Sequence, residues 1–401
     1  MSLDITKVAG QIGSMAEKLK QSGAERSAAL TAAATRLSSG IDTATLRDKV
    51  RLSKTGFLLA APSGEIDERH QPSSPPPSYS VIATDGSHID FDRHHSAPCC
   101  LINIGTVRLD YGDDFGAALD SLPRLLSEDD ELVIRDPDGN RETPLQGALL
   151  GIKRDVEEFS ALAELAAALP PDHPALALSD GTLIRWSLTT QNYDAYVLRE
   201  LLDNGYLKCL GDFRKLCTGR PLGLASYISQ PGGEEVVNTL RLTLCPWEPA
   251  NCDKHCGDLK PGTRPCDPLS GVSDSKLFDR FLDVGERSAV FESTSKVLGQ
   301  YYGEHRICFF YLKLEDEIAR VELPCWLAEA PGRIAFIHSL ILEQVKKGNG
   351  YPVALAEAHE QAVVTGADRA VFYEVVDVYL AEQGLPTNIS AKSFIKQARW
   401  V

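Results

Sequence analysis

The chain has 401 residues, 43% of them hydrophobic, and its 41 Lys and Arg against 56 Asp and Glu give a formal net charge of −15. A chain of this length and composition can bury a sizeable globular core, as one large domain with additions or as two domains. The acidic balance argues against non-specific binding of nucleic acid. The sequence has no apolar run long enough to span a membrane and no signal-peptide centre near its start, so we expect a cytoplasmic protein without membrane attachment.

Helices are the first predicted elements, because residues 4–60 are rich in Ala, Leu, Lys, Glu and Arg with apolar residues at helical spacing. The stretch PSGEIDERHQPSSPPPSYS at 62–80 interrupts this pattern and is too rich in proline for a helix or a central strand. We therefore expect an N-terminal helical segment at 1–61, an exposed Pro/Ser-rich linker at 62–79 and a main domain at 80–401.

Two strand-like runs, YSVIATDGS at 79–87 and APCCLINIGTVRLDYG at 97–112, predict an antiparallel hairpin whose first strand ends at Asp85. A helix follows at about 145–169, and the apolar run ALALS then leads into a second Asp-Gly pair at Asp180. The chain thus repeats one pattern, an apolar strand followed by Asp-Gly and a hydroxyl residue. If the two strands form a parallel pair, two carboxylates meet at one edge of a sheet.

The rest of the chain is interpreted as helices and loops from about 190 to 300, an antiparallel hairpin at 306–326 and two C-terminal helices. The last of these helices, in VALAEAHEQAVVTG, carries His359 and follows the turn NGYP, which contains Tyr351.

Carboxylates from two strand ends and a helix, together with a histidine, form an oxygen-rich site suited to Mg²⁺ or Mn²⁺. Two such ions can activate water and stabilise the leaving oxygen in phosphodiester cleavage. The order Asp85, an acid of the helix segment RDVEEF, Asp180 and His359 is that of a ribonuclease H-like site. Three glutamates are candidates for the helix acid: Glu157, Glu158 and Glu164. We prefer Glu158, because only one face of the helix can point at the sheet edge.

These residues also have ordinary structural alternatives. Asp-Gly is one of the commonest turn pairs, Tyr351 can pack within its Gly-Tyr-Pro turn, and His359 can be a surface residue of its helix. The polar residues that follow the first Asp-Gly pair are interpreted as a solvated hairpin turn and not as ligands: Asp90, Asp92, His94 and His95.

A separate cluster of four cysteines lies in LCPWEPANCDKHCGDLKPGTRPCDP, among Pro, Gly and Asp: Cys245, Cys252, Cys256 and Cys266. Four thiols so close in sequence suit Zn²⁺ or an iron–sulfur cluster, although the spacing matches no standard zinc finger. We expect a Cys-rich insertion at about 243–270 that binds metal, zinc ahead of iron–sulfur, with His255 as a substitute ligand; free loop thiols are the alternative. The other six cysteines lie in apolar runs and are expected to be reduced: Cys99, Cys100, Cys209, Cys217, Cys308 and Cys325.

Four motifs occur along the chain in this order: ATDGSH, LSDGTL, SYISQP with EVVNTLR, and GYPVALAEAHEQA. Through these motifs the chain resembles the NurA family of nucleases over about residues 78–401. The resemblance implies an α/β fold with a ribonuclease H-like mixed sheet flanked by helices, to which the N-terminal helical segment and the Cys-rich insertion are additions. It implies Asp85 and Asp180 as ligands of Mn²⁺ or Mg²⁺, and Tyr351 and His359 as the remaining active-site pair. It also implies a homodimer that cuts DNA with a hexameric HerA-type translocase.

We therefore expect a metal-dependent deoxyribonuclease that digests DNA ends from 5′ to 3′ in double-strand break repair, with single-strand endonuclease cleavage as a further activity. Asp85, Glu158 and Asp180 would hold the ions, and His359 would position the phosphate or assist proton transfer. Two rivals stay open, a non-catalytic partner subunit of a DNA motor and a ribonuclease on the same core. Clustered carboxylates argue against the first, because a scaffold has no use for charges that repel one another.

Overall fold

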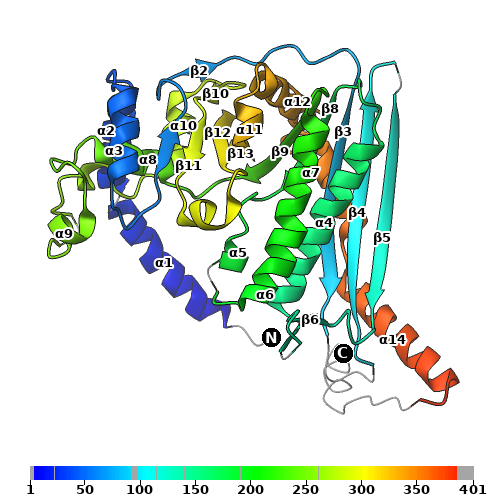
Figure 1. Cartoon of the computed structure of the whole chain (residues 1–401). Coiled ribbons are helices and arrows are strands. Elements are labelled where there is room, and N and C mark those ends of the chain that lie inside the picture. Colours follow the sequence, from blue (N-terminus) through cyan, green and yellow to red (C-terminus); the bar gives the residue numbers. More distant parts are fainter. Residues whose placement is uncertain are drawn as a thin grey trace. The chain divides into compact units, whose positions relative to one another are not determined.

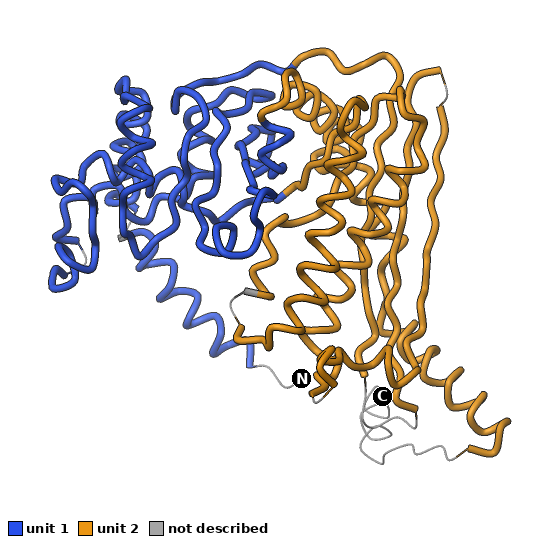
Figure 2. Tube along the Cα trace, in the orientation of Figure 1, with its two compact units in different colours: residues 1–72, 228–328 blue, residues 73–227, 329–401 orange. Residues whose placement is uncertain are grey.

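Figure 1 shows the chain as a computed structural model, which describes residues 4–385 apart from 22, 92–96, 114, 140, 190 and 261. The chain divides into two compact units, and each is assembled from two separate stretches (Figure 2). Unit 1 contains residues 1–72 and 228–328, and unit 2 contains residues 73–227 and 329–401. In the described residues no helix is long and apolar enough to cross a membrane. The domain boundaries expected from the sequence stay a prediction.

Unit 2 is built on a mixed sheet with the strand order β9-β8-β3-β4-β5. Its strands are β3 (Tyr79–Ile89), β4 (Cys100–Tyr111), β5 (Gly116–Leu126), β8 (Ala175–Asp180) and β9 (Leu222–Ser229). The first three strands pair antiparallel in chain order, β8 adds parallel to β3, and β9 adds parallel to β8. The sheet thus has three antiparallel strands, β3, β4 and β5, and two parallel strands, β8 and β9, on the side of β3 away from β4. This is a ribonuclease H-like sheet, so the predicted fold class is confirmed.

Helices cover both faces of the β3–β4 hairpin. The main helices of unit 2 are α4 (Ala148–Ala168), α7 (Lys208–Cys217), α12 (Arg333–Lys347), α13 (Val353–Ala362) and α14 (Gly366–Glu382). Helix α4 forms because its apolar residues recur at three- and four-residue spacing, and it buries Leu149, Ile152, Val156 and Phe159 among others. Helix α4 contacts the sheet at Gly86, and α13 contacts it at Gly105, which is the ladder partner of Asp85. Because Asp85 and Gly86 are successive residues of one strand and face opposite sides, the two helices lie on opposite faces.

Unit 1 combines an antiparallel sheet with the predicted N-terminal helices. The helices are α1 (Ile5–Gln21), α2 (Gly23–Leu37), α3 (Thr43–Leu52), α8 (Glu235–Leu242) and α10 (Asp274–Phe281). The strands are β1 (Ala60–Pro62), β2 (Arg69–His70), β10 (Arg287–Ser288), β11 (Phe291–Ser293), β12 (Ile307–Lys313) and β13 (Ile318–Pro324). Strands β12 and β13 are the hairpin predicted at 306–326. The core packs apolar residues of α2, α8 and α10 against β11 and β12.

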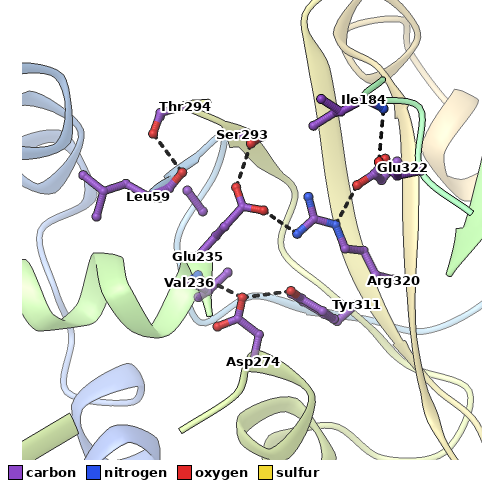
Figure 3. Close-up of polar contacts among 12 residues, drawn as sticks. Leu59, Ile184, Glu235, Val236, Asp274, Ser293, Thr294, Tyr311, Arg320 and Glu322 are labelled. Atoms are coloured by element: carbon purple, nitrogen blue, oxygen red, sulfur yellow. Dashed lines mark hydrogen bonds and ion pairs between the residues drawn. The ribbon is translucent and has the colours of Figure 1, made fainter. Parts of the chain in front are cut away.

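A buried polar network joins α8 and α10 to this hairpin (Figure 3). The guanidinium of Arg320 donates to Glu235 over 2.6 Å and to Glu322 over 2.9 Å, and it lies 3.6 Å from the ring centroid of Phe309. Asp274 accepts hydrogen bonds from the backbone N–H groups of α8 and from the Tyr311 hydroxyl at 2.8 Å. Because these carboxylates are buried and hydrogen-bonded within the core, the network is a structural element of unit 1.

Short elements complete the described chain. They are β6 (Val133–Arg135), β7 (Glu142–Pro144), α5 (Trp186–Thr189), α6 (Ala195–Leu198), α9 (Cys252–Cys256), α11 (Cys325–Ala328), the π-helices η1 (Arg199–Leu207) and η3 (Leu298–Tyr302), and the 3₁₀-helix η2 (Asp267–Leu269).

Three expectations from the sequence are wrong in detail. The first strand does not end at Asp85 but continues to Ile89, because β4 still pairs with β3 after the partner on the other side, β8, has ended. The middle of the chain is not only helices and loops, since LGLASYIS forms the buried strand β9. Two of the six core cysteines are not reduced: Cys308 and Cys325, at the two ends of the β12–β13 hairpin, form a disulfide.

Candidate active site

Two parallel strands bring the Asp-Gly carboxylates to one edge of the unit 2 sheet. In the ladder between β3 and β8, Thr84 pairs with Ser179, and Asp85 and Asp180 are the next residue on each strand. The side chain of Asp85 is 24% exposed, and Asp180 is exposed where β8 ends. The two acids therefore occupy equivalent positions on neighbouring strands.

The two glycines that follow these acids serve different purposes. At Gly86 a Cβ atom would lie 2.9 Å from Cγ of Arg154, so the missing side chain leaves room for the Arg154 side chain of α4. Gly181 instead has a φ of +73°, which L-residues rarely adopt, and its N–H donates to the carbonyl of Tyr227 over 3.0 Å. One glycine permits a close side-chain contact, and the other turns the chain at the end of β8.

Helix α13 approaches Asp85 because the strand beside it carries a glycine. Gly105 is the antiparallel partner of Asp85, and a Cβ atom there would lie 2.3 Å from the carbonyl oxygen of Ala358. The buried side chain of Asn103 donates to the carbonyl of Ala362 over 2.9 Å, which holds the C-terminal end of the helix. At the other end, Oε1 of Gln344 accepts from the N–H of Ala354 over 3.1 Å.

This packing places His359 beside Asp85. Nδ1 of His359 lies 2.7 Å from Oδ2 of Asp85, while the imidazole as a whole is 64% exposed. The ring is therefore held by Asp85 on one side while most of its surface stays open to solvent.

The turn that precedes α13 supplies a partner for the second strand acid. The hydroxyl of Tyr351 donates to Oδ1 of Asp180 over 3.0 Å. Its ring packs edge-on against Tyr227, with the centroids 5.4 Å apart, and Tyr227 is the ladder partner of Asp180 on β9. Tyr351 is thus both a packing residue and a hydrogen-bond donor to an acid of the site.

Of the three candidate helix acids, Glu158 interacts electrostatically with the strand acid Asp85. The pKa of Glu158 is raised to about 8, mainly by burial and in smaller part by the negative charges of Asp85 and Asp155, while Arg185 and Arg154 oppose the rise. Glu157 instead pairs with Arg124 at 2.9 Å, and Glu164 is exposed. Of the three glutamates, Glu158 is thus the one with a resolved electrostatic interaction with Asp85.

Sequence reasoning missed two arginines and an aspartate at the site. Asp155 pairs with Arg185 at 3.3 Å and with its neighbour Arg154, and the guanidinium of Arg185 lies 4.4 Å from the ring centroid of Tyr206. Arg185 follows the second Asp-Gly pair by four residues, and Arg154 and Asp155 belong to the RDVEEF segment. The two guanidinium groups both interact with Glu158 as well as with Asp155, and so offset part of the negative charge of the acids.

The side chains fit a divalent cation by their chemistry. Asp85, Asp180 and Glu158 offer carboxylate oxygens, the ligands that Mg²⁺ and Mn²⁺ prefer, and a bound cation would favour the ionised form of Glu158, whose pKa burial raises. As the side chains stand, no group of three or more His, Cys, Asp or Glu in the described part of the chain has the arrangement of a metal-ligand set.

The other candidates lie elsewhere. Oδ2 of Asp90 accepts from the N–H of Gly147 over 2.8 Å and so fixes the start of α4. Asp92, His94 and His95 lie outside the described residues. The four cysteines of the insertion belong to unit 1 and line one small cavity there.

Comparison with known proteins places the chain in a family. The NurA domain family model matches residues 79–364, whereas no curated protein matches. The NurA nuclease from Sulfolobus solfataricus is a similar solved structure, with a TM-score of 0.48 and 12% identity over 94% of this chain and 96% of that chain. An Argonaute from Aquifex aeolicus has a TM-score of 0.25 and 12% identity, covering 71% of this chain and 28% of that one. The protease–reverse transcriptase of prototype foamy virus has a TM-score of 0.21 and 14% identity, covering 39% and 19%.

Structural similarity at this level gives no argument about function, so the family membership rests on the match to the NurA domain family model. Because its residues make up more than half of the chain and include β3, β4, α4, β8 and α13, the chain belongs to the NurA domain family, and this membership supports a role as a nuclease.

Proposed function

We propose that the chain is a divalent-metal-dependent deoxyribonuclease whose active site is formed by Asp85, Glu158, Asp180, Tyr351 and His359. The single observation that supports the proposal is that two strand acids meet at one sheet edge and that each has a hydrogen-bonding partner from α13 or from the turn before it. His359 of α13 lies 2.7 Å from Asp85, and Tyr351 of the turn lies 3.0 Å from Asp180. Glu158 adds a third carboxylate from the helix α4.

Each side chain has a role that follows from its position. Asp85, Glu158 and Asp180 would hold Mn²⁺ or Mg²⁺, and the chemistry that such ions supply is activation of water and stabilisation of the leaving oxygen. Tyr351 orients the carboxylate of Asp180 through its hydroxyl. Asp85 orients His359, whose exposed ring can meet the phosphate and exchange a proton there. Arg154 and Arg185 add positive charge beside the acids, which favours a phosphate ester as the substrate.

The finer features follow from the family. We propose 5′ to 3′ digestion of DNA ends in double-strand break repair in the cytoplasm, with endonuclease cleavage of single strands, and action as a homodimer together with a HerA-type hexameric translocase. The net charge of −15 supports a partner that grips DNA, because the chain alone would bind the DNA backbone weakly.

Cleavage of end-labelled oligonucleotides tests this function. Single- and double-stranded DNA and matched RNA are incubated with Mn²⁺, Mg²⁺ or EDTA, with and without a HerA-type partner. The proteins compared are the wild type, Asp85→Asn and the control Asp120→Asn, which changes an exposed acid of β5 in the same unit.

The expected result is cleavage of DNA that needs the divalent cation, is lost in Asp85→Asn and is kept in Asp120→Asn. If the wild type is inert with every cation and with the partner present, the non-catalytic subunit becomes the better interpretation. Faster cleavage of RNA than of matched DNA would instead favour the ribonuclease.

A further inference from the structure

The four cysteines of the insertion converge in space as well as in sequence. Cys245, Cys252, Cys256 and Cys266, hereafter the four-cysteine cluster, line a single cavity of about 20 Å³ in unit 1. The thiol of Cys256 interacts electrostatically with the other three. All four are unpaired, although unit 1 contains a disulfide elsewhere. Four cysteines that line one small cavity can supply the donor set of a tetrahedral thiolate site.

The local fold supports this convergence. Cys252 and Cys256 are the first and last residues of the one-turn helix α9, and a spacing of four residues places both on the same helix face. The N–H of Cys252 donates to the carbonyl of Lys54 over 2.9 Å, which ties the helix to the segment after α3. His255, the substitute ligand expected from the sequence, is stacked on Trp247 with the ring centroids 4.8 Å apart and does not line the cavity.

Groups around the cluster are those that stabilise thiolate ligands. Nη2 of the buried Arg241 lies 3.5 Å from Sγ of Cys266, and this guanidinium is held over the ring of Phe57 at 4.5 Å. The backbone N–H of Gly56 donates to the thiol of Cys252. Positive charge and N–H donors directed at sulfur are common second contacts of metal-bound cysteine.

The segment that carries the cluster has little else to hold it. Apart from residue 261, which the structure does not describe, residues 243–271 contain no strand, and their helices are the short α9 and η2. The buried apolar side chains of the segment are Ala250, Cys256 and Leu269. So small a core supplies little hydrophobic stabilisation, and segments of this kind usually depend on a cross-link or a metal.

We propose that the four-cysteine cluster binds one Zn²⁺ as four thiolates and that this ion stabilises the fold of residues 243–271. The ion is a structural one, separate from the cations of the nuclease site. Since no group of His, Cys, Asp or Glu in the described residues is already arranged as a ligand set, binding requires the thiols to turn into the cavity. Four thiolates leave no open position for water, so the site has no catalytic role.

Metal analysis of the untagged protein, purified without chelator, tests the proposal. Elemental analysis should find about one zinc per chain in the wild type. Cys256→Ser and Cys266→Ser should each retain less than about a tenth of it, since a structural site needs its full ligand set. Two controls should keep the zinc: Cys209→Ser, a buried cysteine of α7 in unit 2, and Asp85→Asn at the nuclease site. Replacement by Co²⁺ should give the intense visible absorption of a tetrahedral thiolate site.

A measurement on the wild type alone keeps the test decisive if the serine variants do not fold. Chelation of the zinc should expose four additional thiols to a thiol reagent and lower the temperature of unfolding, and added Zn²⁺ should reverse both changes. Three results would overturn the proposal: absence of zinc from the wild type with no uptake of added Zn²⁺, loss of zinc in Asp85→Asn, or iron with inorganic sulfide in place of zinc. None of these results depends on nuclease activity.

Discussion

Nδ1 of His359 lies 2.7 Å from a carboxylate oxygen of Asp85, although 274 positions separate the two residues in the chain. The contact exists because α13 lies on the strand that pairs with Asp85, where Gly105 has no side chain to keep the helix away. In the proposed nuclease, a histidine held in this way would position the phosphate or exchange a proton there.

Replacement of this histidine tests its role in the reaction. In His359→Ala we expect the rate of single-turnover DNA cleavage to fall by roughly 10²–10⁴-fold, the usual effect of losing a group that positions or transfers a proton. Glu360→Ala, at the exposed next position of the same helix, should cleave at close to the wild-type rate. A decrease of less than about twofold in His359→Ala would remove the residue from the mechanism.

Gly105 should control the active site without belonging to it. In Gly105→Ala the new Cβ would lie 2.3 Å from the Ala358 carbonyl, so we expect α13 to be displaced, with a loss of about 1–3 kcal/mol of stability and a lower cleavage rate. Urea unfolding and cleavage assays measure the two effects. Gly151→Ala is the matched control, because its Cβ would meet its nearest neighbour at 3.8 Å, and alanine in α4 should be neutral or stabilising. Wild-type activity in Gly105→Ala would contradict the positioning of His359 through this contact.

Glu158→Gln should separate metal binding from stability. Burial and neighbouring carboxylates raise the pKa of Glu158 to about 8, so a neutral glutamine should leave the metal-free protein at least as stable as the wild type. The increase in unfolding temperature that Mn²⁺ produces in the wild type should disappear in this variant. Glu164→Gln, which changes an exposed acid of the same helix, should keep the Mn²⁺ effect. A full Mn²⁺ effect in Glu158→Gln would mean that another acid is the ligand.

The buried network of unit 1 should make stability depend on pH. Burial raises the pKa of Asp274 from 3.8 to about 7, while hydrogen bonds from α8 and Tyr311 oppose the rise. An acid whose pKa is raised in the folded state binds its proton more tightly there than in the unfolded chain. Its contribution to the free energy of unfolding therefore falls as pH rises from about 4 to about 7, by at most about 1.4 kcal/mol per pH unit. Above about pH 7 this contribution is constant.

Urea unfolding of the wild type and of Asp274→Asn between pH 4 and pH 8 measures this dependence. The range begins at the lower edge of the expected window and ends about one pH unit above its upper edge. As pH rises to about 7, the urea midpoint of the wild type should fall relative to that of Asp274→Asn, and above about pH 7 the difference between the two midpoints should stay constant. Asp279→Asn, at an exposed position of the same helix, should follow the wild type at each pH. A difference that stays constant across the window would show that Asp274 is ionised throughout.

The sequence by itself determined the local elements and the strand positions of the two Asp-Gly acids. The helical spacing in α4, the alternating and apolar runs of β3, β4 and β8, and the double proline after α4 are properties of neighbouring residues, which explains why these elements were predictable. The repeated Asp-Gly strand motif likewise identified Asp85 and Asp180, because two parallel strands bring equivalent positions to one sheet edge.

Only the tertiary structure decided which residues surround these acids. The pairing of Glu157 with Arg124, the approach of α13 at Gly105 and the contact of Arg185 with Asp155 depend on how a helix rotates and packs on the sheet. The disulfide between Cys308 and Cys325 and the convergence of the four-cysteine cluster have the same origin. Such contacts join residues that are distant in sequence, and no local periodicity encodes them, because packing selects one arrangement of a whole helix or loop from several that its pattern allows.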